Sequence, residues 1–521
     1  MSVAEPSGTV TWRDSLSAFL HPRVVTMLFL GFSAGLPLLM IFSSLSLWLR
    51  EAGVERSAVT LFSWAALGYS FKFVWAPLVD RLPVPWLTRW LGRRRSWLLV
   101  AQCAVIASIL WMAGTDPGSS EHALTLMALA AVMLGFSAAT QDIVIDAYRI
   151  ESAHRDLQAM MAATYIAGYR IGMLVSGAGA LVLADALGSS ADEYVYSAWR
   201  STYALMAATM LVGVVTTLSI PEPERSDKDY ASHPNREYAR FLLLFVLAVA
   251  ALVCTYLLSG PGAATVKETL HAATGNQWLA SLLVETFRLL VGAGLGGAVT
   301  VGLVYAQLAD RTMVNETYVD PVVDFFRRYG TQVAILLLAI IGLYRISDIV
   351  LGVISNVFYQ DLGYSKSEIA FAVKTFGLFM TIAGGFLGGV LAVRHGVYRI
   401  LLLGAVLAAP TNLLFMMLAR IGYDLPMLYV VVAADNLCAG LASAAFVAFL
   451  SSLTNVSFTA MQYAIFSSLM TLIPKVFGGY SGGMVDTIGY SQFFLVTAVM
   501  GVPVIVLVMV AARWLEVRRG V

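Results

Sequence analysis

The stretch His122-Ala-Leu-Thr-Leu-Met-Ala-Leu-Ala-Ala-Val-Met-Leu-Gly-Phe-Ser-Ala-Ala-Thr-Gln-Asp-Ile-Val-Ile-Asp-Ala-Tyr148 is apolar over most of its length and ends with two carboxylates, Asp142 and Asp146. About 20 apolar residues in a row are enough for a helix to cross the hydrocarbon core of a bilayer, so this stretch predicts a membrane-spanning helix. A charge at bilayer depth costs roughly 3 kcal/mol or more and usually faces an aqueous path or a partner charge. The two carboxylates therefore favour a transporter over an inert bundle.

The same combination of apolar segments and isolated charges recurs along the chain. The sequence is 59% hydrophobic and 12% charged, whereas soluble domains are about 45–50% apolar and about 25% charged. This composition is typical of an integral membrane protein, and a formal net charge of +1 gives no reason to expect a nucleic-acid partner. Further charged residues fall within or at the edge of apolar segments: Lys72, Arg170, Arg288, Arg345, Asp348, Lys374, Asp435 and Lys475.

Motifs for enzymatic chemistry are absent from the sequence. No G-x-x-x-x-G-K-[ST] sequence is present to cradle ATP phosphates, and no catalytic triad or metal-ligand spacing occurs. The run Gly292-Ala-Gly-Leu-Gly-Gly297 fits G-x-G-x-x-G, but no strand is predicted before it, so glycine packing explains it. All six histidines fall in predicted tails or loops or, in the case of His122, at the very edge of a predicted span, so a proton relay at membrane depth must use carboxylates. We expect no enzyme activity, no ATP coupling and no cofactor besides a coupling proton.

Apolar segments of about 20 residues predict roughly fourteen spans, arranged as six, two and six. We expect an all-α integral membrane protein with two six-helix bundles and two extra transmembrane helices between them. The predicted spans are 24–49, 57–80, 96–114, 122–148, 158–184, 197–220, 239–259, 285–309, 331–359, 366–391, 397–418, 426–451, 458–483 and 490–514. The predicted parts are a cytoplasmic tail (1–23), a first six-helix bundle (24–220), a cytoplasmic linker (221–238), two extra transmembrane helices (239–309), a second cytoplasmic linker (310–330) and a second six-helix bundle (331–515).

Basic residues gather in the loops on one side of these spans, together with both termini. Cytoplasmic loops of membrane proteins carry an excess of Lys and Arg, so both termini are predicted to be cytoplasmic. The loop after the second span holds Asp80-Arg81 and then Gly92-Arg93-Arg94-Arg95. The corresponding loop of the second bundle runs from Gly388 through Arg394 to Gly396.

Both loops resemble the cytoplasmic G-x-x-x-D-R-x-G-R-R motif of the major facilitator superfamily. The first loop has a longer insertion before its glycine, and the second lacks the Asp. The resemblance implies two parallel repeats with a site between them near the bilayer midplane. It also implies a gating role for a set of loop residues, the alternative being an ordinary basic cytoplasmic turn. These residues are Asp80, Arg81, Gly92, Arg93, Arg94, Arg394 and Gly396.

A narrower resemblance appears in the fourth and fifth spans. The segments Ser137–Arg149, Gly168–Gly177, Lys374–Gly377, Asn436–Gly440 and Ser457–Ala464 resemble the AmpG family of muropeptide permeases. The likeness covers 20–220 and 331–515 and is weaker across 221–330. It implies proton-driven import of anhydro-muropeptides (GlcNAc-anhydro-MurNAc and its peptides) from periplasm to cytoplasm through a bacterial inner membrane. Carriage of another anion, such as acetyl-CoA or a sugar acid, and a non-transporting receptor on a carrier fold are the alternatives.

Asp142 and Asp146 are one helical turn apart and therefore share a face. A carboxylate that moves between a buried site and a site near a cation can bind and release a proton, so we predict that one of them carries it, with Arg170 as partner. A permanent structural ion pair is the alternative. Gly168 and Gly172 are predicted to let a neighbouring helix backbone approach closely.

The remaining candidates are predicted to contact substrate, and ordinary packing or ion pairing is the alternative for each. In the first bundle they are Gln141, Tyr165, Tyr169, Arg170, Lys72 and Trp64; in the second they are Asp348, Lys374 and Asp435. The deeper basic residues outnumber the deeper acidic ones, which favours an anionic solute. We therefore expect an anionic glycopeptide substrate and surrounding membrane lipids as partners.

Overall fold

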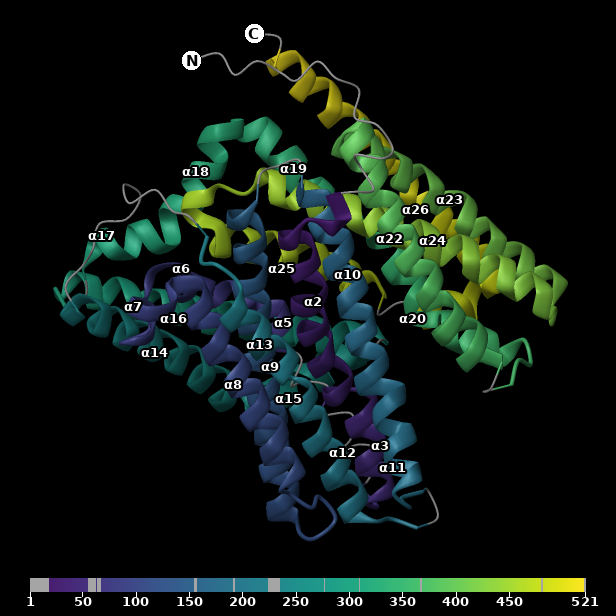
Figure 1. Ribbon diagram of the computed structural model, residues 1–521, viewed down its shortest axis with the longest axis horizontal. Helices are drawn as coiled ribbons and strands as arrows, with labels where there is room; N and C mark the ends of the chain where they lie inside the picture. The colour runs from purple at the N-terminus through teal and green to yellow at the C-terminus, as the bar shows by residue number, and fades with distance from the viewer. Residues whose placement is uncertain are drawn as a thin grey trace. The chain divides into compact units, whose positions relative to one another are not determined.

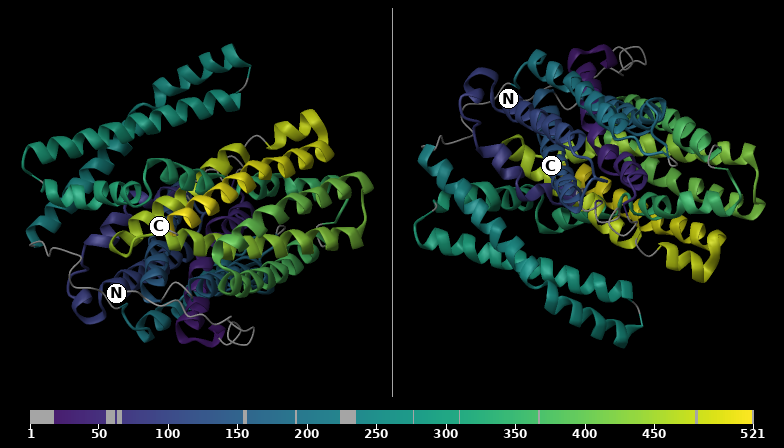
Figure 2. Two further views of the ribbon diagram at one scale, coloured as in Figure 1. Left: turned by 90° about the horizontal axis from the view of Figure 1, so that it is seen from above. Right: turned by 90° about the horizontal axis from the view of Figure 1, so that it is seen from below.

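The structure is a computed structural model that describes residues 18–54, 62, 67–153, 157–190, 193–223, 235–275, 277–308, 310–365, 368–478 and 481–519. These residues form helices joined by short turns, with no strand among them. The chain divides into two compact units, one made of Met1–Arg225 with Phe325–Val521 and the other of Ser226–Asp324. Figures 1 and 2 show the helices from three directions.

The first half of the larger unit is built from helical segments that follow the six predicted spans. Its elements are η1 (Ala18–Leu20), α2 (Pro22–Ile41), α3 (Ser43–Glu51), α5 (Leu67–Phe71), η3 (Lys72–Val74), α6 (Ala76–Arg81), α7 (Leu87–Leu91), α8 (Arg93–Ala113), α9 (Glu121–Ser152), α10 (Gln158–Leu174), η5 (Val175–Gly179), α11 (Ala180–Ala186), α12 (Tyr196–Thr209) and α13 (Leu211–Ser219).

The second half repeats this plan. Its elements are α18 (Asp320–Tyr329), which crosses the unit boundary, α19 (Thr331–Leu343), α20 (Ile346–Asp361), η7 (Ile369–Phe376), α22 (Gly377–His395), α23 (Val397–Ile421), α24 (Leu425–Leu453), η8 (Val456–Phe458), α25 (Thr459–Gly478) and α26 (Ser481–Arg519). In the first half α2 packs on α10, α5 on α9, and α8 on α12. In the second half α19 and α20 pack on α25, α22 on α24, and α23 on α26. Each half thus pairs its first span with its fifth, its second with its fourth, and its third with its sixth.

Thirteen helical segments of the described chain are long and apolar enough to cross a membrane. The predicted all-α, multi-spanning architecture is confirmed. The predicted span 57–80 is described only at 62 and from 67 onward, where it consists of α5, η3 and α6 rather than one continuous helix. Pro77 lies in the first turn of α6, a position that needs no backbone N–H, so the helix restarts there after the break.

The smaller unit is a helical hairpin with a third helix folded against it. It contains α14 (Asn235–Leu258), α15 (Gly260–Thr274), α16 (Gln277–Tyr305), α17 (Arg311–Val314) and η6 (Asn315–Val319). α14 and α15 both pack on α16, and Figure 2 shows the teal hairpin. α14 and α16 match the predicted spans 239–259 and 285–309, whereas the sequence did not predict α15.

Close backbone contact joins α2 to α10. A Cβ atom at Gly168 would collide with the Leu28 carbonyl, and one at Gly172 would collide with the Phe32 carbonyl. Gly31 and Gly35 on α2 make the reciprocal approach to Tyr165 and Tyr169 on α10. Small residues at membrane helix interfaces permit such an approach because lipid offers no hydrophobic drive for association. The predicted role of Gly168 and Gly172 is confirmed.

The two halves of the larger unit meet through a limited set of helices. α10 packs on α22 and α24, and α25 packs on α5, η3, α6 and α9. At the contact of α10 with α22, a Cβ at Gly389 would lie 3.0 Å from Ala163 Cβ. We call the end of this unit that contains Asp80, Arg94 and Glu151 the closed end.

Candidate functional site

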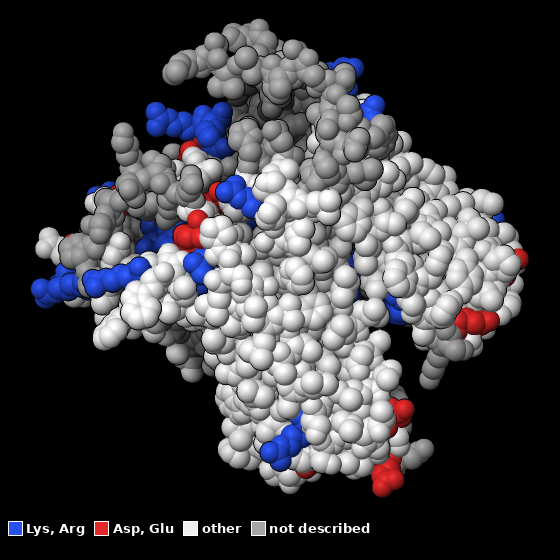
Figure 3. Space-filling model, viewed as in Figure 1, with Lys and Arg blue, Asp and Glu red and all other residues white. Residues whose placement is uncertain are grey.

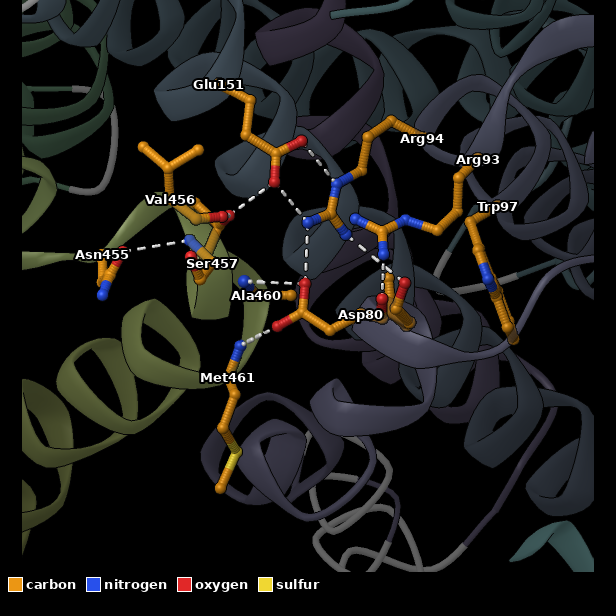
Figure 4. A network of polar contacts seen from close by, with 12 residues as sticks. Asp80, Arg93, Arg94, Trp97, Glu151, Asn455, Val456, Ser457, Ala460 and Met461 are labelled. Atoms are coloured by element: carbon orange, nitrogen blue, oxygen red, sulfur yellow. Dashed lines mark hydrogen bonds and ion pairs between the residues drawn. The ribbon is translucent and has the colours of Figure 1, made fainter. Parts of the chain in front are cut away.

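Arg94 occupies the centre of the closed end, and its side chain is 1% exposed. Its Nη2 lies 2.7 Å from Asp80 Oδ1 and 2.5 Å from Glu151 Oε1, and its Nε donates to Glu151 Oε2 at 2.9 Å. These groups come from α8, α6 and α9, so one guanidinium neutralises two carboxylates from two other helices (Figure 4). A buried cation with full hydrogen bonding to its counter-charges is a stable arrangement.

The same carboxylates bind the second half of the unit. Asp80 accepts hydrogen bonds from the backbone N–H groups of Ala460 (3.2 Å) and Met461 (2.9 Å), in the first turn of α25. The Thr459 hydroxyl donates to Glu151 Oε1 at 2.5 Å. The first backbone N–H groups of a helix have no partner within it, and the helix dipole favours an anion there. Asp80 therefore caps α25 across the interface, as Figure 4 shows.

Gly92 and Glu222 fix the start of α8. Gly92 has φ +81°, and a Cβ there would collide with the Glu222 side chain. Glu222 Oε1 accepts from the Arg94 N–H at 2.8 Å and Oε2 from the Arg95 N–H at 3.1 Å. In return, Arg95 donates to the carbonyls of Thr217 (3.0 Å) and Leu218 (2.7 Å) at the end of α13. The helix ends cap each other, which no local sequence pattern indicated.

The second copy of the loop motif is built differently. Gly396 has φ +86° and lies between α22 and α23, so it forms the same kind of turn with positive φ as Gly92 does before α8. Arg394 is exposed, and the position matching Asp80 holds no acid. In the first copy, Arg93 also donates to the Asp80 carbonyl, while Arg81 is half-buried at the end of α6. The gating roles of all these residues remain predictions.

A second charged group, which we call the central cluster, consists of Lys72, Asp142, Asp146 and Arg149. Asp146 lies between two cations, with Oδ2 3.7 Å from Lys72 Nζ and Oδ1 3.2 Å from Arg149 Nη2. Arg149 is fully buried. It donates to Ser451 Oγ of α24 at 2.7 Å and lies 5.2 Å from the Tyr463 ring of α25. Asp146 is thus an ion-paired carboxylate whose partner arginine reaches the other half.

Asp142 lies one turn before Asp146 and is 8% exposed. Its Oδ1 has no hydrogen-bond partner among the described residues. The charges of Lys72 and Asp146 both act on this carboxyl group, and the Tyr165 hydroxyl is close enough to hydrogen-bond to it. The two neighbouring acids therefore differ in that Asp146 has a cation at each oxygen, whereas one oxygen of Asp142 has no partner among the described residues.

Arg170 is not the partner of these acids. No ion pair or hydrogen bond of Arg170 occurs in the described part of the chain, where its side chain is half-buried on α10. Five residues separate Arg170 from Tyr165, which is about 140° around a helix, so the two side chains point to different faces.

In the second half, Arg345 Nε lies 3.4 Å from Asp348 Oδ2, and Arg345 Nη1 donates to Ser443 Oγ at 2.6 Å. The charge of Asp435 interacts with those of Asp348 and Arg345. Lys374 is exposed and donates to Asn356 Oδ1 of α20 at 3.2 Å. Asp348 is thus paired with Arg345, Lys374 is bonded to Asn356, and Asp435 is half-buried on α24.

Four residues singled out by the sequence need separate mention. Gln141 is fully buried and neither amide atom has a partner in the described chain. It shares its helical face with Tyr148, whose hydroxyl donates to the Pro221 carbonyl. Trp64 and the Lys475 side chain lie outside the described residues. Tyr169 lies beside Tyr165, with ring centroids 6.0 Å apart.

Sequence reasoning missed Glu151, Glu222, Tyr69 and Tyr463. Tyr69 is near Tyr169 and Asp142, and its buried hydroxyl has no partner in the described residues. Only the neighbourhood of a charged motif could have pointed to Glu151, two residues after Arg149. The partners in α24 and α25 depend on tertiary contacts that no sequence spacing encodes.

Away from the closed end the two halves diverge. Figure 3 shows a hollow between the lower lobe, which holds α3, α11 and α12, and the right-hand lobe, which holds α20, α22 and α24. Lys or Arg atoms are visible in this hollow. The larger unit therefore has a cleft that is open on the side opposite the closed end.

Comparisons with known proteins agree with this architecture. A family model described as Major Facilitator Superfamily matches residues 24–349 and 336–520. The anhydromuropeptide permease of Escherichia coli K12 is 29% identical over 505 residues, covering 97% of this chain and 82% of that protein. A transporter named AmpG 4 of Rickettsia conorii is 28% identical over 491 residues, covering 94% of this chain and 97% of that protein.

Two solved structures share the fold at low sequence identity. The proton:xylose symporter XylE matches with a TM-score of 0.56 at 13% identity, over 95% of each chain. The transporter FucP, in its outward conformation, matches with a TM-score of 0.56 at 11% identity, over 95% of this chain and 99% of that one.

Proposed function

Because the chain belongs to the major facilitator superfamily, we propose that it is a proton-coupled carrier that imports anhydro-muropeptides from periplasm to cytoplasm. The central cluster carries the proposal, since it places buried charged groups of α9 and η3 against α24 and α25 of the other half. Relatives named as anhydromuropeptide permease and AmpG transporter support this substrate class. We place the protein in a bacterial inner membrane with both termini in the cytoplasm, and with no ATP or cofactor beyond the proton.

Transport by such a carrier requires the cleft to open alternately on each side. In the present arrangement the closed end is held by three kinds of contact between halves. These are Asp80 on the N-terminus of α25, Glu151 with Thr459, and Arg149 with Ser451. Opening on the cytoplasmic side requires these contacts to break. The new contacts that form between the halves when the cleft closes must then supply a comparable free energy.

Asp142 is our choice for the proton carrier. An ionised carboxylate that is buried without a partner costs several kcal/mol, so such groups bind a proton instead. Asp142 has a buried oxygen without a partner in the described residues, whereas Asp146 has two cations. Of the two acids, Asp142 is therefore the better placed to take up a proton. One proton that moves through 100 mV supplies about 2.3 kcal/mol, enough for roughly fiftyfold accumulation at one-to-one coupling.

Uptake of radiolabelled GlcNAc-anhydro-MurNAc tests the proposed function. The host lacks its own permease, and uptake is measured with and without an uncoupler. We expect accumulation that the uncoupler abolishes and that unlabelled disaccharide, but not acetyl-CoA, competes away. Accumulation that survives the uncoupler would contradict proton coupling, and competition by acetyl-CoA would favour the alternative anion carrier.

The Asp142→Asn variant tests the proton carrier. An amide mimics the protonated carboxyl, so we expect exchange of labelled for unlabelled substrate across proteoliposomes to continue while gradient-driven accumulation is lost. Gradient-driven accumulation at the unmodified level would show that Asp142 does not carry the proton.

A further inference from the structure

The start of α10 lies at the closed end and touches α22 of the second half. The Gln158 amide, in the first turn of α10, donates to the Arg149 carbonyl at 3.0 Å. This bond ties the start of α10 to α9, the helix that carries Glu151. Across the interface, a Cβ atom at Gly389 of α22 would lie 3.4 Å from the Ala159 carbonyl oxygen. The two halves therefore meet here as well as at α25.

Small apolar side chains fill this contact, which we call the dry seam. Ala159 of α10 forms one buried cluster with Ala392 of α22 and with Ala445 and Ala448 of α24. The stabilisation that a dry contact supplies grows with the apolar area that it buries. Alanine side chains bury little area, so they hold the two halves together only weakly.

Phe19 adds an aromatic ring to the dry seam. It belongs to η1, which precedes α2 in the first half and contacts α10. Its ring packs edge to face on the ring of Phe386 of α22, with the centroids 5.0 Å apart and the planes at 73°. A Cβ at Gly389, three residues further along α22, would lie 3.5 Å from Phe19 Cζ. Phe19 therefore reaches from the first half onto a helix of the second.

This contact differs in chemistry from the other contacts of the closed end. Asp80 and Glu151 hold α25 through hydrogen bonds, whereas Phe19 holds α22 through an apolar ring. An aromatic pair in edge-to-face geometry favours contact by about twofold to tenfold in an equilibrium constant, beyond the effect of the buried area. Opening of the closed end on the cytoplasmic side separates the halves, so this pair must break as well.

We propose that Phe19 is a latch of the closed end, and that its ring must leave Phe386 before the carrier opens to the cytoplasm. The inference rests on the alternating access of the proposed function and deepens it, because it assigns a gating residue that lies outside both copies of the loop motif. The latch favours the form that is open opposite the closed end, which is the form that takes up cargo from the periplasm.

Two spin labels report whether the closed end is open. One replaces Arg89 on α7, between the helices that carry Asp80 and Arg94, and the other replaces His395 at the end of α22. Both positions are exposed and belong to different halves. The two exposed cysteines are first replaced by serine. In the purified full chain without cargo, the ratio of long to short label distances then gives the ratio of the open to the closed form of this end.

Removal of the ring should favour opening. Phe19→Ala should raise the ratio of long to short distances about twofold to tenfold relative to the natural sequence. Phe19→Leu keeps apolar bulk without the aromatic ring, so it should fall between. Phe287→Ala removes a ring that is 67% exposed on α16 of the smaller unit. This matched control should leave the ratio unchanged.

A double-mutant cycle tests whether the two rings act on each other. Phe19→Ala and Phe386→Ala are measured alone and together with the same labels. Residues in contact show non-additive effects, whereas independent residues add. The combined variant should therefore raise the ratio by less than the product of the two single factors, with a shortfall of about twofold to tenfold. A combined factor equal to that product would overturn the latch.

The outcomes separate this inference from the proposed function. If the natural protein does not take up GlcNAc-anhydro-MurNAc, the proposed function fails, while the label distances still test the latch. If the natural protein transports the disaccharide but Phe19→Ala keeps the natural ratio of distances, Phe19 is not a latch. A lower unfolding midpoint with an unchanged ratio would show that Phe19 only stabilises the fold. If Phe19→Ala does not fold, Phe19→Leu provides the comparison, and a natural ratio for it overturns the latch.

Discussion

The closed end and the central cluster are both buried groups of charges, yet they are compensated in opposite ways. At the closed end, Arg94 is bonded to Asp80 and Glu151, and both acids have further donors from α25 or its N-cap. In the central cluster, Asp146 is paired while Asp142 keeps an unpartnered oxygen within the described chain. A buried network in which every polar group is hydrogen-bonded stabilises one conformation. A network with an unpartnered polar atom can still bind a ligand or a proton there.

Arg94→Ala should have the largest effect on stability. It leaves two buried carboxylates without their cation, which typically costs about 3–5 kcal/mol. We expect a clear drop in the thermal unfolding midpoint in detergent and a shift toward the form open on the cytoplasmic side. Arg89→Ala, an exposed position on α7, is the matched control and should change neither. An unchanged midpoint for Arg94→Ala would show that the closed end contributes little.

Asp146→Asn and Asp142→Asn should differ in stability although they are the same substitution one turn apart. Asp146→Asn removes the counter-charge of Lys72 and Arg149, so we expect a loss of about 2–4 kcal/mol. Asp142→Asn replaces a carboxyl that we hold to be protonated, so we expect a loss below about 1 kcal/mol. Equal losses, measured by denaturant unfolding, would remove the distinction between the two acids.

Glu222→Gln should have a smaller effect. It removes a negative charge from the N-terminus of α8, which is worth about 0.3–1 kcal/mol. We expect a small decrease in the unfolding midpoint and faster proteolysis of the linker that contains Glu222. Glu193→Gln, a solvent-exposed acid in an outer loop, gives the baseline. A change as large as that of Arg94→Ala would mean that Glu222 belongs to the gate itself.

The smallest effect on stability is expected at Glu368, which precedes η7 at the outer end of the second half. Glu368 accepts hydrogen bonds from the Tyr423 hydroxyl (2.6 Å) and from the Ser365 N–H (2.8 Å). These bonds, that of Tyr423 first, lower the pKa of the Glu368 carboxyl. A lowered pKa in the folded state adds stability above the unfolded pKa, and this stability is lost as pH falls through the folded value. Glu368→Gln should therefore be slightly less stable than the natural protein at pH 7 and equal to it in strong acid, by thermal melts across pH.

The sequence predicted most of the fold because span length and apolar composition are local properties. The pairs that share one helix, such as Asp142 with Asp146 or Arg345 with Asp348, also follow from helical spacing. What the sequence could not supply is which helix faces which. The pairing of Asp146 with Lys72 and of Arg149 with Ser451 depends on the packing of α9 against other helices.

The break in the second span was also beyond the sequence pattern. Residues 57–80 are apolar enough for a single helix, and Pro77 alone does not fix where a helix begins. In the structure Lys72 lies in η3, between α5 and α6, and this turn places its ammonium group against Asp146. A continuous helix would direct that side chain elsewhere, so the site depends on the irregular geometry.

Arg149 links two events that a carrier must keep in step. Its guanidinium touches Asp146 on its own helix and Ser451 on the opposite half. A change of charge about two turns away, at Asp142, alters the electric field at this guanidinium. The hydrogen bond of Arg149 to Ser451 of α24 can then strengthen or weaken without a long chain of coupled movements. Proton binding at Asp142 and the stability of the contact between the halves therefore both depend on this one residue.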